Sequence, residues 1–541
     1  MGVDCDAGSR ITALGDREGN SAGVRNADGS GFGIISIKPS GPCRDSSVCV
    51  RLERVTENSE NNTNELRIAV IGAGPAGVYS SDIFLRQLKK LGESLNLGIK
   101  ARIDLFEKLP VPFGLVRYGV APDHPSIKFI ADALEKTLDN PDIHLYCDVE
   151  FGKDVTIEEL LERYDAVLFA TGAVKDKPLK LPGADLEGVY GAAKFVEWYD
   201  GYPTGARTWP LTAERVAVIG GGNVAMDVAR ELMRNADDLK AKTDIPDNVY
   251  DGIQGNKARE LHLFIRRGVA QAKFSVQELR EMEKLPGVQL VIDEDDFELD
   301  DETIEVAQKD KLTRQMVEEL YTIREMAEDM EDDGDVDFEG NPANRKYYVH
   351  FNSAPTEILG EDGKVKAIRV ERTETSADGK MTRLGEFDEY PVEAVYHAIG
   401  YQPAAAPGIA YDVRGAHLAN ANGDGRITAS AESGAEVRDR LYATGWAKRG
   451  PVGLIGSTKS DALAIVTNML EDLAKAAEGG RVAPDRDPES IDRLLASRGV
   501  KPIDFAGWKK IDAFERAEGA KEGREHKKVI DPDQMRRLAH A

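Results

Sequence analysis

The sequence predicts an α/β fold built on parallel sheets, and two stretches of the chain carry most of that prediction. Each is a short β-branched run that ends in a glycine-rich turn and continues with helical spacing, at 66–92 and at 215–233. A further β-type run follows each helix, at 101–108 and at 260–268. Strand, helix and strand in this order form a βαβ unit, whose two strands lie parallel. Additional strands are expected at 164–173, 392–401 and 439–446.

Length and charge limit the class of protein. At ~150 residues per domain, 541 residues suggest about three domains or lobes. The formal net charge of −25 argues against binding to nucleic acid or to an anionic membrane surface. The sequence contains neither an apolar run long enough for a transmembrane helix nor the charged-then-apolar start of a secretory signal.

Cysteine is scarce, which excludes several kinds of site. The four cysteines form no CxxC pair, so we expect no disulfide framework, no dithiol redox pair and no metal site. A reduced, cytoplasmic protein is the expectation.

Residues 1–64 differ in composition from the rest of the chain, being rich in Gly, Ser, Asn and Asp. Only 34–37 and 48–52 resemble strands. A disordered N-terminal tail is predicted here, and a short appended ordered element is the alternative.

The first glycine-rich turn, at 72–77, fits a dinucleotide site. Gly72 permits the tight turn, Gly74 lets the backbone approach a pyrophosphate, and Gly77 lets helix and strand pack closely. The helix N-terminus adds positive potential for the phosphates. Glu107 ends the next strand, where its carboxylate can accept hydrogen bonds from ribose hydroxyls. This arrangement suits FAD, whose adenosine ribose has no 2′-phosphate.

The second glycine-rich turn, Gly220 to Ala225, is followed by a different strand end. Arg266 and Arg267 stand there, and paired guanidinium groups can bind a phosphate bidentately. A carboxylate would repel a 2′-phosphate, so this turn predicts an NADP(H) site. The alternative is that the two arginines are ordinary surface charges. Two nucleotide sites in one chain imply two cofactors that exchange electrons.

Several long blocks carry a resemblance beyond the glycine turns. They are 107–125 (EKLPVPFGLVRYGVAPDHP), 220–230 (GGGNVAMDVAR), 266–282 (RRGVAQAKFSVQELREM) and 444–462 (TGWAKRGPVGLIGSTKSDA). In this order they resemble the adrenodoxin reductase family of NADPH–ferredoxin reductases. The match runs from about Leu66 to the C-terminus, and it is weak in the acidic stretch 293–340.

The resemblance implies two three-layer Rossmann-like lobes, a discontinuous FAD lobe and an NADP lobe inserted into it. The corresponding boundaries are a tail at 1–64, the first part of the FAD lobe at 65–173, the NADP lobe at 174–397, and the second part of the FAD lobe with the C-terminal segment at 398–541. Residues 170–172 and 398–401 resemble the two crossing strands.

Carried over residue by residue, the resemblance implies contacts to both cofactors. FAD contacts are implied for Ala76, Glu107, Leu115, Val149, Trp446 and the backbone of Gly453, Leu454 and Ile455. NADPH contacts are implied for Gly222, Asn223, Val224, Ala225, Arg266, Arg267 and Glu278, with Gly453 near the nicotinamide. Leu115 and Val149 have an alternative as ordinary core residues.

The implied reaction passes hydride from NADPH to the flavin and single electrons to a ferredoxin-type iron–sulfur protein, or the reverse. The resemblance places His124 and Asp227 near the reacting rings, where a hydrogen-bonded histidine can relay a proton. A structural role for His124 is the alternative.

The resemblance also places a basic ferredoxin-docking face around Arg280, with further basic residues at Lys273, Lys284 and within 309–314. These charges alternate with acidic ones, so a mixed solvated face is the alternative. A monomer is expected.

Three other classes share part of this pattern. A thioredoxin reductase type needs a CxxC near the flavin, which the sequence lacks. A glutamate synthase small-subunit-like diaphorase is the retained alternative, although Cys5, Cys43 and Cys49 do not form its expected cysteine clusters. A regulatory NADPH-binding module would keep both glycine turns but bind no FAD.

Overall fold

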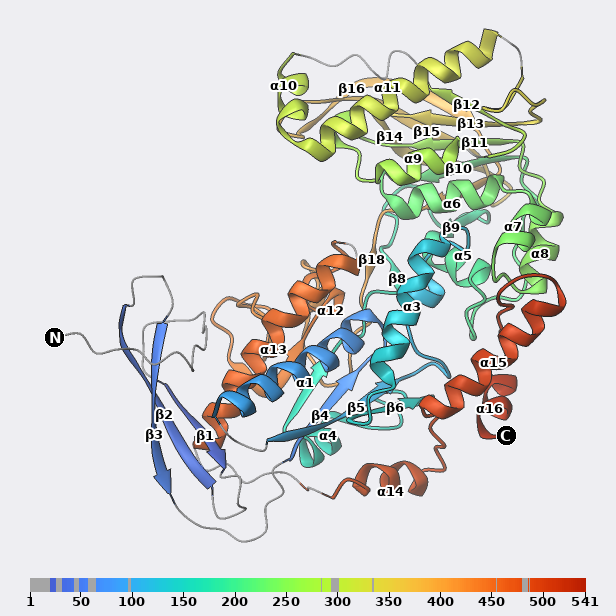
Figure 1. Ribbon diagram of the computed structural model, residues 1–541. Coiled ribbons are helices and arrows are strands. Elements are labelled where there is room, and N and C mark those ends of the chain that lie inside the picture. Colours follow the sequence, from blue (N-terminus) through green and yellow to red (C-terminus); the bar gives the residue numbers. More distant parts are fainter. Residues whose placement is uncertain are drawn as a thin grey trace.

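Two mainly parallel β-sheets, each in a lobe of its own, form the body of the protein (Figure 1). The computed structural model describes residues 20–25, 32–42, 48–56, 65–95, 99–283, 285–292, 301–332, 335–453, 455–478, 485 and 487–541. Helices pack against both sheets, so the predicted α/β class with parallel sheets is confirmed.

The first lobe is built on a six-stranded sheet with the order β21-β22-β7-β4-β5-β6. Its strands are β4 (Glu65–Ile71), β5 (Lys100–Glu107), β6 (Ile143–Cys147), β7 (Ala166–Phe169), β21 (Arg426–Thr428) and β22 (Val437–Ala443). Its helices include α1 (Pro75–Leu95), α2 (Leu115–Tyr118), α3 (Pro125–Leu138), α4 (Ile157–Arg163), α12 (Trp446–Arg449) and α13 (Ile455–Glu478). Along β4, Ile68 and Val70 face one apolar cluster and Ala69 and Ile71 face another, as a strand buried on both faces requires.

The second lobe contains a six-stranded parallel sheet with the order β12-β13-β11-β10-β17-β9. Its strands are β9 (Val189–Gly191), β10 (Arg215–Ile219), β11 (Glu260–Phe264), β12 (Val288–Ile292), β13 (Arg345–His350) and β17 (Ala394–His397). The accompanying helices are α5 (Ala192–Tyr199), α6 (Asn223–Met233), α7 (Ala236–Lys242), α8 (Asp247–Gln254), η1 (Val269–Gln271), α9 (Val276–Met282), α10 (Asp301–Lys309) and α11 (Lys311–Asp332). The central strand β10 is again buried on both faces.

A three-stranded antiparallel sheet belongs to the second lobe as well. It comprises β14 (Ser353–Glu361), β15 (Lys364–Thr375) and β16 (Met381–Pro391). Ile358 and Ile368 from this sheet pack with Ala217 and Ile219 of β10, so it covers one face of the parallel sheet. The sequence patterns above contain no prediction of this element.

Two short strands connect the lobes. β8 (Lys175–Asp176) and β18 (Tyr401–Gln402) pair antiparallel between the two bodies (Figure 1). The chain thus leaves the first sheet after β7 and returns to it after β17, which makes the first lobe discontinuous.

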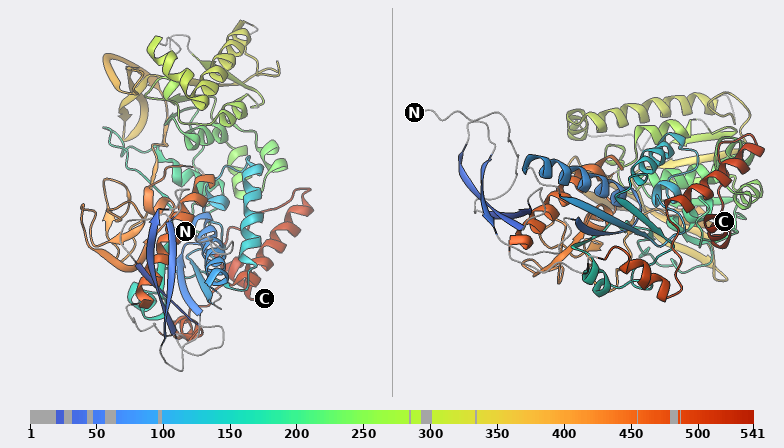
Figure 2. Two further views of the ribbon diagram at one scale, coloured as in Figure 1. Left: turned by 60° about the vertical axis from the view of Figure 1, so that its left-hand side comes forward. Right: turned by 60° about the horizontal axis from the view of Figure 1, so that its bottom comes forward.

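The C-terminal segment contacts both lobes, and its helices are α14 (Ser490–Ser497), α15 (Phe505–Lys521) and α16 (Pro532–His540). Helices α15 and α16 lie at one side of the molecule, and α14 lies below the first sheet (Figure 1 and Figure 2). Lys528 Nζ donates to the carbonyl oxygen of Arg117 at 2.9 Å and to Asp200 Oδ1 at 3.1 Å. Arg524 donates to the carbonyl oxygen of Ile245 at 2.7 Å.

Three strands are described within residues 1–64. β1 (Asn20–Arg25), β2 (Phe32–Pro42) and β3 (Val48–Thr56) form an antiparallel sheet, and two of them cover the stretches that resembled strands. The other residues of the predicted N-terminal tail lie outside the described part of the chain. In the described part of the chain, no helix combines the length and apolarity that crossing a membrane requires.

Candidate functional site

The first glycine turn is fixed by the end of β5. The N–H of Gly72 donates to the carbonyl oxygen of Phe106 at 2.7 Å, and the N–H of Ala73 donates to Glu107 Oε2 at 3.0 Å. The other oxygen, Glu107 Oε1, accepts from the N–H of Leu109 at 3.0 Å. Burial raises the pKa of Glu107 against the opposing effect of these N–H donors. Each carboxylate oxygen has a second lone pair, so ribose hydroxyls can still bind.

The glycines of this turn have different surroundings. A Cβ at Gly77 would lie 2.0 Å from the carbonyl oxygen of Gly72, so only glycine lets the helix pack this closely. A Cβ at Gly74 would find its nearest neighbour, Gly114 Cα, 3.9 Å away. The backbone at Gly74 therefore offers open space of the kind a pyrophosphate needs, and the turn fits FAD.

The segment that begins at Trp446 lies against this turn. Gly445 has φ +60°, and a Cβ there would lie 2.8 Å from Ala76 Cβ. The N–H of Gly445 donates to Asp461 Oδ2 at 2.6 Å, which ties the segment to α13. Trp446 is half-buried at the start of α12. Ala76 and Gly445, which are far apart in the sequence, thus lie side by side, and Trp446 follows directly.

The other predicted flavin contacts stand as follows. Gly453 has φ +86° and precedes α13, which begins at Ile455, while Leu454 lies outside the described residues. Leu115 is half-buried at the start of α2. Val149 is 1% exposed within an apolar cluster, as the core alternative expects. Cofactor contacts at these positions stay predictions.

The second glycine turn leaves a similar opening. Gly220 donates its N–H to the carbonyl oxygen of Phe264 at 3.1 Å. No heavy atom lies within 4 Å of a Cβ built on Gly222, which caps the N-terminus of α6. Asn223 Oδ1 accepts from the N–H of Ser275 at 2.9 Å and holds the turn against α9. An open glycine at a helix N-terminus fits a pyrophosphate.

Arg266 and Arg267 follow β11 directly, next to this turn. Arg266 is exposed and Arg267 half-buried. Among the residues that the structure describes, neither guanidinium group has an acidic partner, and Arg267 Nε is buried without a hydrogen bond. Two unpaired guanidinium groups beside the second glycine turn fit the 2′-phosphate of NADP(H).

A small apolar cluster joins the two openings. Val224, from the second glycine turn, and Trp446 both pack against a cluster formed by Ala173, Ala193 and Tyr401. Tyr401 belongs to the connecting strand β18. One residue from each candidate site therefore lies at the point where the chain crosses between the lobes.

Beside this junction lies a buried network of charged side chains centred on Arg230. His124 Nε2 lies 3.0 Å from Asp227 Oδ1 and 3.3 Å from Glu278 Oε2. Arg230 is 0% exposed and donates to Asp227 Oδ1 at 2.6 Å and to Glu278 Oε2 at 2.8 Å. Arg230 also pairs with Asp123, Nε to Oδ2, at 2.6 Å. The predicted pair His124 and Asp227 is thus brought together, and Glu278 joins it.

Electrostatics in this network favour a charged histidine. Burial lowers the pKa of His124, but hydrogen bonds to Asp227 and Glu278 outweigh burial and raise the pKa to about 10. Burial raises the pKa of Asp227. For Glu278, burial acts in the same direction, yet the bonds from His124 and Arg230 hold its pKa below the usual value. His124, Asp227 and Glu278 are spaced like metal ligands, but the guanidinium of Arg230 already donates to the two carboxylates.

Two members of this network are absent from the sequence-based prediction. Asp123 immediately precedes His124, and Arg230 stands one turn after Asp227 on α6. The sequence did hold one signal for Arg230: it stands three residues after Asp227, a spacing that places both side chains on one face of a helix. Nothing in the sequence indicated that Asp123 would reach Arg230 across the lobes.

The predicted docking residue Arg280 is paired with an acid. Its Nε lies 2.7 Å from Glu319 Oε1 and its NH2 lies 2.9 Å from Glu319 Oε2, so α11 holds it in a bidentate bridge. Lys273 is exposed, and Lys284 lies outside the described residues. Within 309–314, Lys309 pairs with an acidic neighbour at 2.7 Å. The described part of this face has mixed charge.

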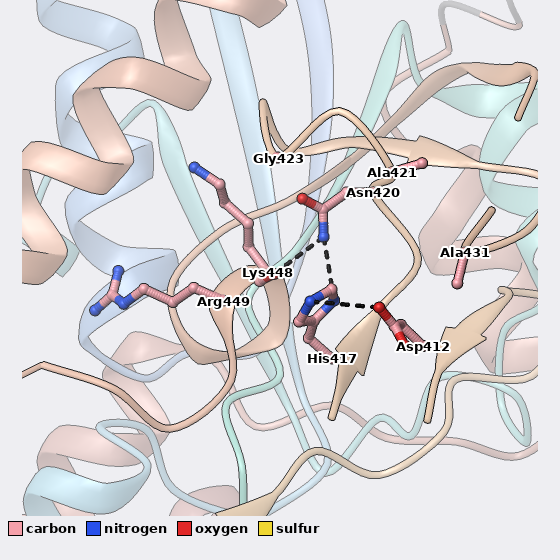
Figure 3. Close-up of a pocket in the computed structure, with 8 residues that line it drawn as sticks. All are labelled: Asp412, His417, Asn420, Ala421, Gly423, Ala431, Lys448 and Arg449. Carbon is pink, nitrogen blue, oxygen red and sulfur yellow. Dashed lines mark hydrogen bonds and ion pairs between the residues drawn. The ribbon is translucent and has the colours of Figure 1, made fainter. Parts of the chain in front are cut away.

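A pocket of about 320 Å³ lies elsewhere in the first lobe, around the hairpin of β19 (Tyr411–Asp412) and β20 (His417–Leu418) (Figure 3). Asn420 Nδ2 donates to the carbonyl oxygen of Lys448 at 3.0 Å. The side chains of Lys448 and Arg449 extend away from His417, and both pair with Asp461. None of the predicted cofactor contacts lines this pocket.

Comparison with known proteins agrees with this geometry. The family model "Pyridine nucleotide-disulphide oxidoreductase" matches residues 66–245. NADPH-ferredoxin reductase FprA of Mycobacterium tuberculosis is 36% identical over 479 residues, which cover 87% of this chain and 98% of that protein. Mitochondrial NADPH:adrenodoxin oxidoreductase of Bos taurus is 34% identical over 482 residues, which cover 87% and 92%. The structure of Mycobacterium tuberculosis FprA in complex with NADPH superposes with a TM-score of 0.78 and covers 88% of this chain and 100% of that one.

Proposed function

Since the chain belongs to the family of NADPH–ferredoxin reductases that includes FprA and adrenodoxin reductase, we propose that it passes electrons from NADPH through FAD to a ferredoxin-type iron–sulfur protein. The observation that carries this proposal is the apolar cluster at the lobe junction. Val224 and Trp446 pack against the same cluster, which supports placing the two nucleotide sites next to one another. The nicotinamide and flavin rings must meet for hydride transfer, and this junction brings their sites together.

The residues of the first lobe hold FAD in this proposal. The turn at Gly72 to Gly77 receives the pyrophosphate, Glu107 faces the ribose, and Trp446 with the backbone at Gly453 lies at the ring. When bound, FAD supplies the exchange between a two-electron hydride and single electrons. The protein's own contribution is to position the ring and to exclude water from the junction.

The residues of the second lobe hold NADPH. Gly222 opens the turn to the pyrophosphate, and Arg266 and Arg267 bind the 2′-phosphate. NADH lacks that phosphate, so these two guanidinium groups would distinguish the two nucleotides.

His124 and Asp227 are proposed to hold the proton that accompanies flavin reduction or oxidation. Against burial and the nearby charge of Arg230, hydrogen bonds to Asp227 and Glu278 raise the pKa of His124 to about 10. A protonated histidine beside the flavin stabilises negative charge and can relay a proton.

The partner is proposed to dock near Arg280 on α9. Its guanidinium is on the surface and in reach of a partner's carboxylates, although Glu319 pairs with it in the free protein. An exposed ion pair contributes little stability, so an acidic partner can exchange with Glu319.

A cytoplasmic location is part of the proposal. It rests on the scarcity of cysteine, and Cys147 is a buried free thiol.

The test is electron transfer to cytochrome c, with NADPH or NADH as donor and with or without an added ferredoxin. We expect a yellow protein whose NADPH-driven rate rises when ferredoxin is added. Purified protein without bound flavin would contradict the FAD site, and a rate that no ferredoxin stimulates would contradict the partner.

A further inference from the structure

Two buried side-chain nitrogens that lack a hydrogen bond flank the central strand of the second sheet. In the described part of the chain, these are Arg267 Nε, just after β11, and His397 Nδ1, at the end of β17. Ile219 of β10 is in register with Phe264 of β11 on one side and with His397 on the other. Both residues therefore stand at the carboxyl ends of strands that flank β10, the strand that leads into the second glycine turn.

The strand order reverses at this point of the sheet. β10 lies between β11, the next strand of this sheet in the sequence, and β17, which the chain enters only after β13 and the antiparallel sheet. Ligands of open parallel sheets bind at such a point, across the carboxyl ends of the strands. A dinucleotide whose pyrophosphate lies over Gly222 therefore extends toward β11 with one half and toward β17 with the other.

The two directions can be assigned from the described contacts. Arg266 and Arg267 follow β11, so the 2′-phosphorylated adenosine half belongs there. On the other side, the carbonyl oxygen of Ala398 would lie 2.6 Å from a Cβ on Gly220, so the end of β17 adjoins the glycine turn. The chain then continues to Tyr401, which packs with Trp446 near the flavin site. The nicotinamide half must point this way to reach the flavin.

We propose that His397 is an NADP(H)-binding residue whose Nδ1 forms a hydrogen bond with the ribose of the nicotinamide half. This inference rests on the proposed NADP(H) site and adds a contact on its unassigned side. His397 is 9% exposed, and a buried polar atom without a partner is costly unless a ligand supplies one. Burial also lowers the pKa of His397, which keeps the imidazole neutral and able to donate or accept. The residue positions the cofactor and takes no part in the chemistry.

The test compares two ligands that share the adenosine half. NADP⁺ contains both halves, whereas 2′,5′-ADP contains only the half assigned to the arginines. Dissociation constants are measured by calorimetry on the flavin-loaded protein and its variants. His397→Phe preserves bulk but removes Nδ1, whereas His397→Asn places an amide at a similar position.

The expected result is selective. His397→Phe weakens NADP⁺ binding about two- to tenfold, the range for one hydrogen bond, and leaves 2′,5′-ADP within twofold. His397→Asn restores most of the NADP⁺ affinity. Arg267→Ala weakens both ligands, and His417→Phe, in the first lobe, changes neither.

Three outcomes would overturn the inference: unchanged NADP⁺ binding in His397→Phe, equal weakening of both ligands, or no rescue by asparagine. Failure of the underlying NADP(H) site gives a different result, because Arg267→Ala would then leave 2′,5′-ADP binding unchanged. Thermal unfolding of each variant identifies a change that acts through stability alone.

Discussion

Arg230 of the second lobe forms a bidentate ion pair with Asp123 of the first, with Nε to Oδ2 at 2.6 Å and NH2 to Oδ1 at 3.0 Å. The same guanidinium donates to Asp227 and Glu278, the two carboxylates around His124. One buried cation thus ties the lobes together and organises the charged groups beside the junction.

Removing this cation should destabilise the protein strongly. Arg230→Met removes the cation that Asp123, Asp227 and Glu278 share. This leaves Asp123 with Arg234 and the other two carboxylates with His124. Breaking one side of a buried pair costs about 3–5 kcal/mol, which urea unfolding would detect. The double variant Asp123→Asn/Arg230→Met is the control, since it removes charges of both signs and should recover part of the loss. A loss below about 1 kcal/mol would show that the network is not an important interlobe contact.

Discrimination between NADPH and NADH should depend on the arginine pair. Replacing both Arg266 and Arg267 by alanine removes the charge-assisted bonds to the 2′-phosphate, each worth about 1.5–3 kcal/mol. We expect KM for NADPH to rise at least tenfold and KM for NADH to change little. Arg259→Ala, which removes an arginine at the opposite end of β11, is the control. Equal effects on both nucleotides would refute the 2′-phosphate role.

Substitutions of the two members of the Arg280–Glu319 ion pair should change the KM for ferredoxin in opposite directions. Arg280→Gln should raise KM for an acidic ferredoxin, whereas Glu319→Gln frees Arg280 and should lower it, each by about two- to fivefold. Both effects should shrink at high salt because the charges are exposed. Glu328→Gln, on the same helix and paired with Arg324 at 3.1 Å, makes the same charge change as a control. NADPH-driven ferricyanide reduction should be unaffected by all three variants; if Arg280→Gln leaves the KM for ferredoxin unchanged, the docking face lies elsewhere.

Two glycines of the first turn should fail in different ways. Gly77→Ala places a Cβ 2.0 Å from the carbonyl oxygen of Gly72, so the turn must shift and the variant should lose both FAD and stability. Gly74→Ala meets no protein atom closer than 3.9 Å, so it should fold normally but bind FAD more weakly. Flavin absorbance per protein, together with thermal unfolding, separates the two effects. Full flavin content in Gly74→Ala would contradict the assigned pyrophosphate site.

Stability should fall in mild acid because of a histidine pair in the second lobe. His262 Nδ1 lies 3.0 Å from His350 Nε2, and burial lowers the pKa of His262 to about 4 and that of His350 to about 3. In the unfolded chain both imidazoles bind a proton near pH ~6.5, whereas in the folded protein they stay neutral down to a lower pH. The stability of the folded state that depends on neutral imidazoles is therefore complete above pH ~6.5 and is lost as the pH falls toward ~4. In this pH range each histidine should lower the free energy of unfolding by up to about 1.4 kcal/mol per pH unit. Urea unfolding between pH 7.5 and 4.5 measures the slope, and His350→Phe should reduce it; an unchanged slope would contradict the assignment.

Elements fixed by local pattern were predictable from the sequence. The runs around Ile68 and Val218 became β4 and β10, because β-branched residues next to a glycine turn leave few other backbone choices. The sheet of β14 to β16 was not predicted. Most of β16 is exposed, so apolar alternation gives no signal there.

The residues of the candidate site likewise divide into those that the sequence could predict and those that it could not. Gly72, Gly77 and Gly220 were identifiable because each must allow a backbone approach or a φ that other residues resist. The Arg230–Asp123 pair and the Arg280–Glu319 bridge were not, because each joins elements distant in sequence.

By itself, then, the sequence predicted the two glycine-rich turns and the strand ends that follow them, with Glu107 after the first and Arg266 and Arg267 after the second. Its net charge of −25 argues against nucleic acid and anionic membranes as partners. Only the tertiary structure decided which charges neutralise one another: Glu319 pairs with Arg280, whereas no described acid pairs with Arg266 or Arg267. The physical reason is that backbone requirements are local and leave a mark in the residues themselves. Coulombic pairing depends on distances of a few ångströms, and only the folded chain sets those distances.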